Sequence, residues 1–201
     1  PAGSGGRLET LELDVTNAEQ IRAAVARITP ATGDAGLWGL FNNAGIAVSG
    51  PLECLPIDDL RRQLEVNVIG QVAVTQAFLP LLRRARGRIL TTGSIAGFFA
   101  APALGAYSIS KHAVEAFSDA LRRELRPWGI EVSLLEPGAI ATEIWEKGAS
   151  DLDGIMRDPP PGLVENYGGL VDALRKAAAN SAQHASPTAF VTREVVHAFT
   201  A

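Results

Sequence analysis

The chain opens on an alternation of apolar and polar residues that then changes to a helical spacing. Leucines alternate with polar residues over 8–13, which predicts a short strand. Thr16 and Glu19 have the spacing of a capping box, and apolar residues recur every three or four positions after them. This pattern predicts an amphipathic helix that ends near Pro30.

Further strands and helices alternate along the next hundred residues. The compact apolar run at 37–41 predicts a strand that is buried on both faces. The same patterns predict helix 58–84, strand 87–92, helix 110–126 and strand 130–135. Strands that alternate with amphipathic helices predict a parallel sheet with helices on both faces, so the fold class is α/β.

The segment 142–185 departs from this regularity. Glycines and a run of three prolines interrupt it, and one helical stretch is predicted near 163–178. We interpret the segment as an insertion, or lid, above the sheet. A final helix is predicted after Pro187, and residues 1–201 form one domain. The expected inward residues of that helix are Phe190, Val191, Val195 and Phe199.

Composition excludes several classes of function. Of the 201 residues, 47% are hydrophobic and 20% are charged, which favours a packed core. The formal net charge of −4 argues against nucleic acid or an anionic membrane as a partner. Cys54 is the single cysteine, so disulfides and multi-cysteine zinc sites are excluded and a reducing, cytoplasmic location is expected. The apolar runs are too short for a membrane span.

Three segments with unusual composition directly follow predicted strands. They are Asn42–Gly45, Thr92–Gly97 and Glu136–Thr142. Ligands of open parallel sheets bind beyond the carboxyl ends of the strands, where such loops meet. The sequence therefore places a candidate site at this edge.

The candidate reacting group is a tyrosine with a lysine one helical turn later. Tyr107 and Lys111 share a helix face, and a nearby cation lowers the pKa of a phenol toward neutral pH. Ser94 follows the preceding strand, and Asn67 is a polar residue within an apolar helical stretch. A surface Tyr–Lys pair and a local helix bend at Asn67 are the alternative interpretations. Together the four residues favour a proton-transfer site.

These residues carry a family resemblance. The sequence resembles the short-chain dehydrogenases/reductases over nearly its whole length. Over residues 39–45 and 114–125 it further resembles the branch of retinol, steroid and 3-hydroxybutyrate dehydrogenases. The motifs, all in family order, are Asp14-Val15, Asn42-Asn43-Ala44-Gly45, Asn67, Ser94, Tyr107-x-x-x-Lys111 and Pro137-Gly138-x-x-x-Thr142.

The resemblance implies a Rossmann-like fold and an NAD- or NADP-dependent oxidoreductase. It implies that Tyr107 is the general acid/base, that Lys111 lowers its pKa and holds the nicotinamide ribose, and that Ser94 polarises the substrate oxygen. Asn67 would anchor a water that relays protons. The implied cofactor-binding residues are Asp14, Val15, Asn43, Ala44, Gly45, Tyr107, Lys111, Pro137, Gly138, Ile140 and Thr142.

The substrate implied is a secondary alcohol or ketone. An apolar, steroid- or retinoid-like one is expected, because many loop residues near the nicotinamide would be apolar, although these could equally be lid residues that pack on one another. They are Phe98, Phe99, Leu104, Ile144, Trp145, Ile155, Met156 and Tyr167. The resemblance also implies a homodimer or homotetramer, formed through the helices over 68–82 and 113–125.

The chain departs from the family at both ends. It enters at the third family strand, without the glycine-rich phosphate turn, and it stops before the last strand. The family strand order is 3-2-1-4-5-6-7, so the expected sheet lacks the first two strands and the last. We therefore expect the 201-residue chain to bind dinucleotide poorly, with a longer parent as the enzyme.

Other functions are weighed against this one. A serine hydrolase elbow needs glycines where Thr92 and Ala96 stand. Asp151 and Asp153 hint at calcium but lack the other ligands of a binding loop, and no metal site is expected. The remaining alternative is a non-catalytic member of the fold that acts in assembly or binding.

Overall fold

The computed structural model describes residues 8–142, 156–157, 159 and 161–201. Its regular elements begin with α1 (Ala18–Thr32), η1 (Gly33–Ala35), β1 (Gly39–Asn42), α2 (Ile57–Leu64), the π-helical turn η2 (Glu65–Gly70) and α3 (Gln71–Ala85). They continue with β2 (Arg88–Thr92), η3 (Ile95–Gly97), α4 (Gly105–Leu125), η4 (Arg126–Trp128), β3 (Glu131–Leu135), α6 (Leu163–Gln183) and α7 (Thr188–Thr200).

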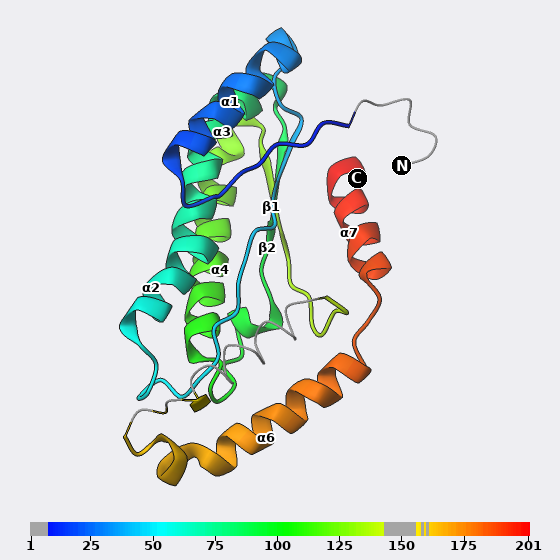
Figure 1. Cartoon of the computed structure of the whole chain (residues 1–201). Coiled ribbons are helices and arrows are strands. Elements are labelled where there is room, and N and C mark those ends of the chain that lie inside the picture. The colour runs from blue at the N-terminus through cyan, green and yellow to red at the C-terminus, as the bar shows by residue number, and fades with distance from the viewer. Residues whose placement is uncertain (1–7, 143–155, 158, 160) are drawn as a thin grey trace.

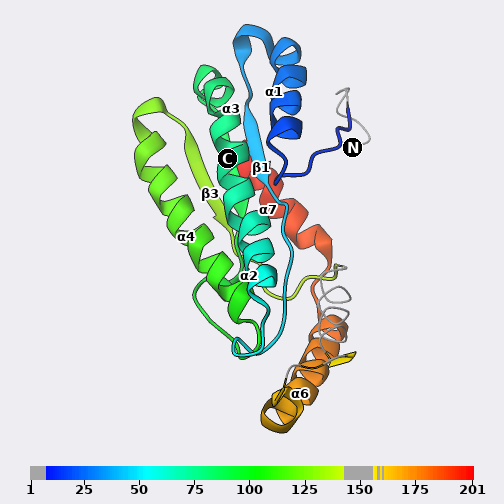
Figure 2. The ribbon, with the colours of Figure 1, turned by 60° about the vertical axis from the view of Figure 1, so that its left-hand side comes forward.

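The sheet described has three parallel strands in the order β1-β2-β3. Leu40 pairs with Ile89, and Leu90 pairs with Ser133, so the three strands end at one edge. Helices α1, α3 and α4 cover one face, and α7 lies on the other (Figures 1 and 2). The α/β class and the layered, Rossmann-like arrangement are therefore confirmed.

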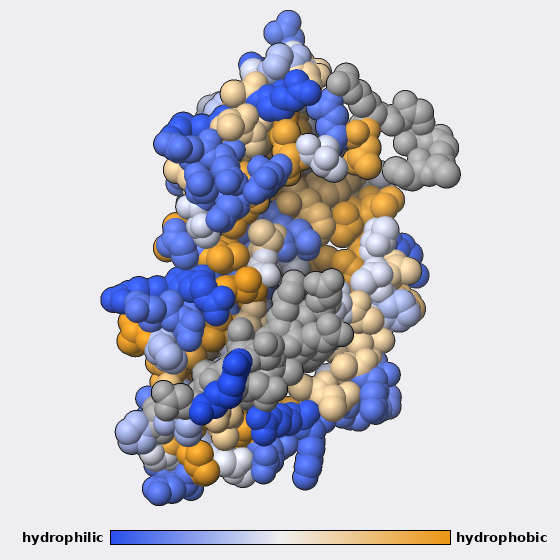
Figure 3. Space-filling model, viewed as in Figure 1, coloured by the Kyte–Doolittle hydropathy of each residue, from blue (hydrophilic) through white to orange (hydrophobic). Residues whose placement is uncertain are grey.

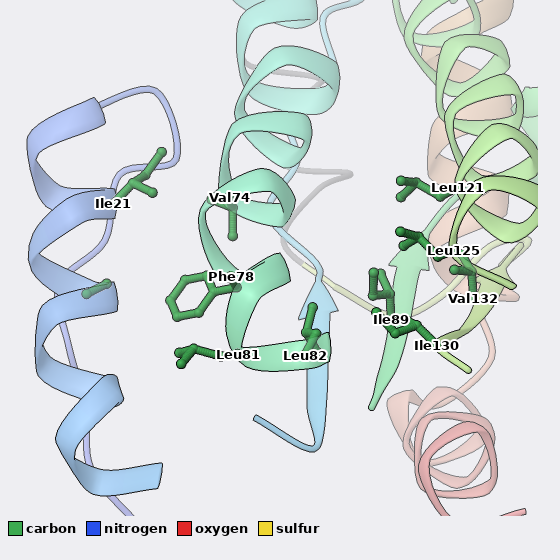
Figure 4. Close-up of a cluster of buried hydrophobic side chains, with 11 residues drawn as sticks. Ile21, Val74, Phe78, Leu81, Leu82, Ile89, Leu121, Leu125, Ile130 and Val132 are labelled. Carbon is green, nitrogen blue, oxygen red and sulfur yellow. The ribbon is translucent and has the colours of Figure 1, made fainter. Parts of the chain in front are cut away.

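The main core lies between the sheet and the three-helix layer, where the apolar faces of α1, α3 and α4 meet the strands (Figure 4). Phe78 and Leu82 of α3 are at most 3% exposed, and Ile89 of β2 is 1% exposed. The buried members of this cluster are Ile21, Ala24, Val74, Phe78, Leu81, Leu82, Ile89, Leu121, Leu125, Ile130 and Val132.

The strand expected over 8–13 is wrong. Residues 8–13 have no strand pairing, and Leu8, Leu11 and Leu13 are exposed. A strand requires a hydrogen-bonded neighbour, and among the described residues β1 pairs only with β2. Figure 3 shows hydrophobic surface between this segment and α7.

Two details of the following elements also differ from expectation. Asn17, rather than Thr16, caps α1, because its Oδ1 accepts hydrogen bonds from the main-chain N–H groups of Glu19 and Gln20 at 2.9 and 3.2 Å. The strand expected over 37–41 begins at Gly39 and is half-buried rather than buried on both faces, and β1 lies at the edge of the described sheet.

The last helix contacts the sheet through its C-terminal half. Trp38 Nε1 donates a hydrogen bond to the Phe199 carbonyl at 3.4 Å, and Arg88 donates to the Ala198 carbonyl at 3.0 Å. Phe199 also lies against Gly39, where a Cβ atom would approach its ring to 2.5 Å. Val191, Val195 and Phe199 are half-buried as expected, whereas the inward position expected for Phe190 is wrong, since that side chain is 53% exposed.

The run from α2 to α3 is long and apolar. By length and composition alone, Ile57–Ala85 would suffice to cross a membrane. In the fold, Val74, Phe78, Leu81 and Leu82 of this run belong to the core. Packing against the sheet and α1 therefore accounts for the apolar residues of its α3 part.

Candidate functional site

Ser94, Tyr107 and Lys111 meet at the carboxyl edge of the sheet. Ser94 lies two residues beyond the end of β2 and caps η3, since its Oγ accepts a hydrogen bond from Ala96 N at 3.2 Å. Tyr107 and Lys111 lie one turn apart near the start of α4. A serine from a strand end and two residues of one helix are thus brought to one place.

Tyr107 is partly buried, and its phenol lies beside the Ser94 side chain. Burial raises the pKa of Tyr107 above its ordinary value of 10.0, and the interaction with the Ser94 hydroxyl acts in the opposite direction. The direction of this shift is opposite to the expected fall. Loss of water around the phenol outweighs the stabilisation of its anion.

Lys111 is almost fully buried, with 4% of its surface exposed. Its Nζ donates a hydrogen bond to the Thr92 carbonyl at 2.6 Å and lies 5.6 Å from the centre of the Tyr107 ring. Burial lowers the pKa of Lys111 to about 8, although the charge of Glu115 acts in the opposite direction. The residue is charged at neutral pH, in a place where its charge is poorly hydrated.

Asn67 is fully buried in the π-helical turn, and its side chain joins two parts of the site. Its Oδ1 accepts a hydrogen bond from Ile46 N at 2.8 Å, while its Nδ2 donates to the Ile46 carbonyl at 2.9 Å and to Ser110 Oγ at 3.0 Å. Ser110 Oγ in turn donates to the Tyr107 carbonyl at 2.7 Å. Both amide protons are thus used to connect the loop after β1 with α4.

The segment Asn43–Gly45 leaves the end of β1 beside the same group of residues. All three residues are exposed, and Thr92 Oγ1 donates a hydrogen bond to Asn43 Oδ1 at 2.9 Å. A Cβ atom on Gly45 would lie 3.5 Å from Asn67 Oδ1. Small residues at 44 and 45 leave this loop surface open to a ligand.

Asp14 and Val15 lie in the turn before α1. The Asp14 carboxylate accepts hydrogen bonds from Thr16 N at 2.9 Å and Thr16 Oγ1 at 2.8 Å, and these bonds lower the pKa of Asp14. Val15 packs against Gly70, where a Cβ atom would meet the Val15 side chain at 2.7 Å. This pair therefore borders the helix that carries Asn67 rather than the Tyr107 group.

The segment after β3 supplies the remaining expected residues. The Pro137 carbonyl accepts hydrogen bonds from Ile95 N at 3.3 Å and from Ser94 Oγ at 3.5 Å, which places this residue beside Ser94. Gly138 has open space where a Cβ atom would stand. Ile140 forms an isolated bridge with Ser186, and Thr142 is exposed at the end of the described segment.

The donor groups of the site fit a nicotinamide dinucleotide. A lysine ammonium carries three N–H donors, of which the described chain uses one at Thr92, so the ammonium of Lys111 can also bind ribose hydroxyls. Residues 43–45 are exposed and Gly138 has free space around its Cα atom, so a ring of the cofactor can approach the main chain closely at both places. Within the described ranges, His, Cys, Asp and Glu form no group of three suited to a metal.

Some of the apolar residues expected near the substrate are exposed in the structure, and others lie outside the described residues. Phe98 and Phe99 are 67% and 62% exposed, directly after η3. Tyr167 of α6 donates a hydrogen bond to Glu53, which links α6 to the loop after β1. Ile144, Trp145, Ile155, Asp151 and Asp153 lie outside the described residues.

Sequence reasoning missed three buried residues that support the site: Gln63, Gln71 and Ser110. The glutamines stand four positions before and after Asn67, so a polar spacing of four within an apolar helix was the available signal. The serine-hydrolase alternative gains no support. His112 Nδ1 is hydrogen-bonded to the Ser108 carbonyl at 2.8 Å, on its own helix.

Comparison with known proteins gives one consistent family. A family model for short chain dehydrogenases matches residues 2–153. The chain is 50% identical over 140 residues to the 3-amino-tetrahydro-pyrrolizinone reductase of Xenorhabdus hominickii, covering 70% of this chain and 49% of that protein. It is 46% identical over 168 residues to 17-beta-hydroxysteroid dehydrogenase type 6 of Bos taurus, covering 81% and 52%. The chain thus spans about half the length of these curated relatives.

Solved structures agree with these sequence matches. A short-chain dehydrogenase/reductase from Burkholderia phymatum in complex with NAD has a TM-score of 0.66 and 29% identity, with 80% of this chain and 55% of that chain covered. A short chain dehydrogenase from Burkholderia cenocepacia in complex with NADP has a TM-score of 0.63 and 31% identity, with 80% and 61% covered.

Proposed function

The chain belongs to the short-chain dehydrogenase family, and on this premise we propose that it supplies the catalytic residues of an NAD- or NADP-dependent oxidoreductase. The reaction is hydride transfer between the nicotinamide and a secondary alcohol or ketone. One observation carries the proposal. The partly buried Tyr107 lies between the Ser94 side chain and the buried ammonium of Lys111, 5.6 Å from the centre of its ring.

Tyr107 acts as general acid in the direction of reduction. At neutral pH its raised pKa keeps the phenol protonated, so the hydroxyl donates its proton to the oxygen of the ketone as the carbonyl carbon becomes an alcohol carbon. Ser94 orients that oxygen through a second hydrogen bond. Oxidation reverses these steps, with the tyrosinate taking the hydroxyl proton.

Lys111 stabilises the tyrosinate that remains after proton donation. Its ammonium lies 5.6 Å from the ring centre in a site with little water, where a positive charge interacts strongly with an anion. Asn67 and Ser110 hold α4 in place through the Tyr107 carbonyl. The water that Asn67 anchors for the proton relay bonds the remaining acceptor lone pair of its side-chain oxygen, because both side-chain N–H groups are used.

The cofactor is held by the loops that follow the strands, together with Lys111 of α4 and the turn before α1. Lys111 binds the ribose hydroxyls, Asn43–Gly45 line the cleft, and Pro137, Gly138, Ile140 and Thr142 border the nicotinamide. Asp14 and Val15 contact the adenine. When bound, the nicotinamide supplies or accepts the hydride. Related structures hold NAD in one case and NADP in another, which supports this choice of cofactor.

The substrate class follows from the exposed aromatic residues beside Ser94. Phe98 and Phe99 present apolar surface directly after the helical turn that Ser94 caps, which favours a substrate with an apolar body. The name of one relative, a 17-beta-hydroxysteroid dehydrogenase, supports the same class. We propose an apolar secondary alcohol or ketone, including steroid- or retinoid-like compounds.

The test is removal of one hydroxyl. In the full-length polypeptide that carries this sequence, Tyr107→Phe should lower kcat for ketone reduction by about 10²- to 10⁴-fold, measured at the nicotinamide absorbance. Thr192→Val is the control. It loses only an exposed hydroxyl that donates to the Thr188 carbonyl within α7, and it should retain kcat within about threefold. Equal rates for wild type and Tyr107→Phe would contradict the catalytic assignment of Tyr107. Absence of turnover in both proteins would favour the non-catalytic alternative.

A further inference from the structure

Four buried polar residues stand at every fourth position along the helical run from α2 to α3. Gln63 and Asn67 are 0% exposed, and Gln71 and Thr75 are 1% exposed. We call these four residues the polar column. They lie within a helix whose neighbouring residues are largely apolar, so their burial requires partners.

The partners lie at every second position of the chain that leaves β1. Thr75 Oγ1 accepts a hydrogen bond from Asn42 Nδ2 at 2.8 Å, and Gln71 Nε2 donates to the Ala44 carbonyl at 2.9 Å. Asn67 bonds both main-chain groups of Ile46. Gln63 shares the Ile46 carbonyl with Asn67, since its Nε2 donates to that oxygen at 2.7 Å. Its Oε1 accepts a hydrogen bond from Val48 N at 2.7 Å.

The π-helical turn makes this match geometrically possible. In a regular α-helix of 3.6 residues per turn, residues four apart are rotated by about 40°, so three such steps drift by about 120°. The wider π turn at Glu65–Gly70 rotates less per residue and reverses this drift. Side chains from 63 to 75 can therefore face one extended segment.

The segment from 43 to 48 depends on these bonds. Strand pairing stops at Asn42, and the described bonds to the main chain of Ala44, Ile46 and Val48 come from side chains of the polar column. Ala44 lies in the middle of the loop Asn43–Gly45 that lines the proposed cofactor site. Its carbonyl is held by Gln71.

Gln71 contributes little to stability by itself. Its Oε1 is buried and has no hydrogen-bond partner among the described residues. A buried polar atom without a partner is unfavourable, and it offsets the gain from the single bond that Nε2 makes. An apolar side chain of similar length would avoid this penalty, so the fold alone does not require an amide here.

We propose that Gln71 is a positioning residue, which fixes the Ala44 carbonyl and so holds the loop Asn43–Gly45 in the shape that binds the dinucleotide. The inference rests on the proposed function for its ligand. The effect of Gln71 on the conformation of the loop does not depend on which ligand binds there. Thr75 is the natural comparison, because it belongs to the same column but bonds a residue of β1 outside the cofactor loop.

The experiment compares Gln71→Met with Thr75→Val in the full-length polypeptide. Gln71→Met should weaken binding of NADH or NADPH about three- to tenfold in a fluorescence titration, with a smaller change in kcat at saturating cofactor. Its unfolding midpoint in denaturant should equal or exceed that of wild type. Thr75→Val should show the reverse, a lower midpoint with unchanged cofactor affinity, because Asn42 Nδ2 loses its described partner.

Hydrogen exchange separates failure of this inference from failure of the proposed function. Main-chain amides in 43–48 should exchange faster in Gln71→Met, while those of β2 and α4 keep the wild-type rate. Unchanged exchange in this loop would overturn the inference, as would a general loss of stability in Gln71→Met. Wild-type protein that binds neither dinucleotide would overturn the proposed function and with it the ligand assigned to Gln71, while the exchange rates would still decide the placement of the loop.

Discussion

Lys111 Nζ donates a hydrogen bond of 2.6 Å to the carbonyl of Thr92, the last residue of β2. This bond holds a buried ammonium at the point where strand pairing ends and the site begins. Thr92 also donates through its hydroxyl to Asn43. One strand end therefore positions both the proposed charge that stabilises tyrosinate and the first residue of the cofactor loop.

The burial of Lys111 predicts an unusual dependence of stability on pH. The folded protein releases the Lys111 proton near its pKa of about 8, whereas the unfolded chain keeps it until about 10.5. Between these values the unfolded state binds more protons, so the free energy of unfolding rises with pH. Over pH 8–10 the rise from this residue should reach about 2 kcal/mol, measured by denaturant unfolding at each pH.

The Lys111→Met variant isolates this effect. Other groups titrate in the same range, and the raised pKa of Tyr107 acts in the opposite direction above pH 10. The quantity to follow is therefore the difference in free energy of unfolding between wild type and Lys111→Met over pH 8–10. Parallel curves for the two proteins would show that the folded-state pKa of Lys111 is not lowered.

The bonds of Asn67 predict unequal effects for two neighbouring substitutions. Asn67→Ala leaves the Ile46 N–H without its partner and should lower the free energy of unfolding by about 2–3 kcal/mol. Ser110→Ala should cost about 1 kcal/mol, because Asn67 Nδ2 keeps its bond to the Ile46 carbonyl. Urea unfolding of both variants measures the difference. If Ser110→Ala were the more harmful change, the bond to Ile46 would not be the main role of Asn67.

The order of elements could be predicted because it depends on local periodicity. The strand predicted at 8–13 failed for a physical reason, since alternation indicates which side chains share a face but does not supply a pairing partner. The cap of α1 failed more narrowly. Asn17 directly precedes the first helical residue and is the N-cap. The capping box predicted at Thr16 and Glu19 therefore starts one residue too early.

The buried face of the long helix shows where hydropathy misleads. Leu60, Leu64 and Val68 recur at helical spacing in the sequence, yet they are only half-buried. Complete burial falls to Gln63, Asn67 and Gln71, because the loop after β1 offers main-chain partners for their amides. No scale based on single residues contains that information.

The candidate site could be predicted as a set of residues but not as an electrostatic environment. Ser94, Tyr107 and Lys111 were indicated by their positions relative to strands and by helical spacing. The direction in which the pKa of Tyr107 shifts depends on how much water the fold removes from the phenol, which no spacing in the sequence specifies.

Gly70 provides a last test, of the contact between the π-helical turn and the residues before α1. Gly70 is helical, with φ of −60°, and a Cβ atom there would lie 2.7 Å from Val15 Cγ2 and 2.9 Å from the Val15 carbonyl oxygen. Gly70→Ala should therefore lower the free energy of unfolding by about 1–3 kcal/mol, despite the better helix propensity of alanine. Gly169→Ala is the matched control, because Gly169 lies inside α6 with open space around it, and alanine there should stabilise by about 0.5–1 kcal/mol. Thermal or urea unfolding that finds Gly70→Ala as stable as Gly169→Ala would show that Val15 does not pack against this turn.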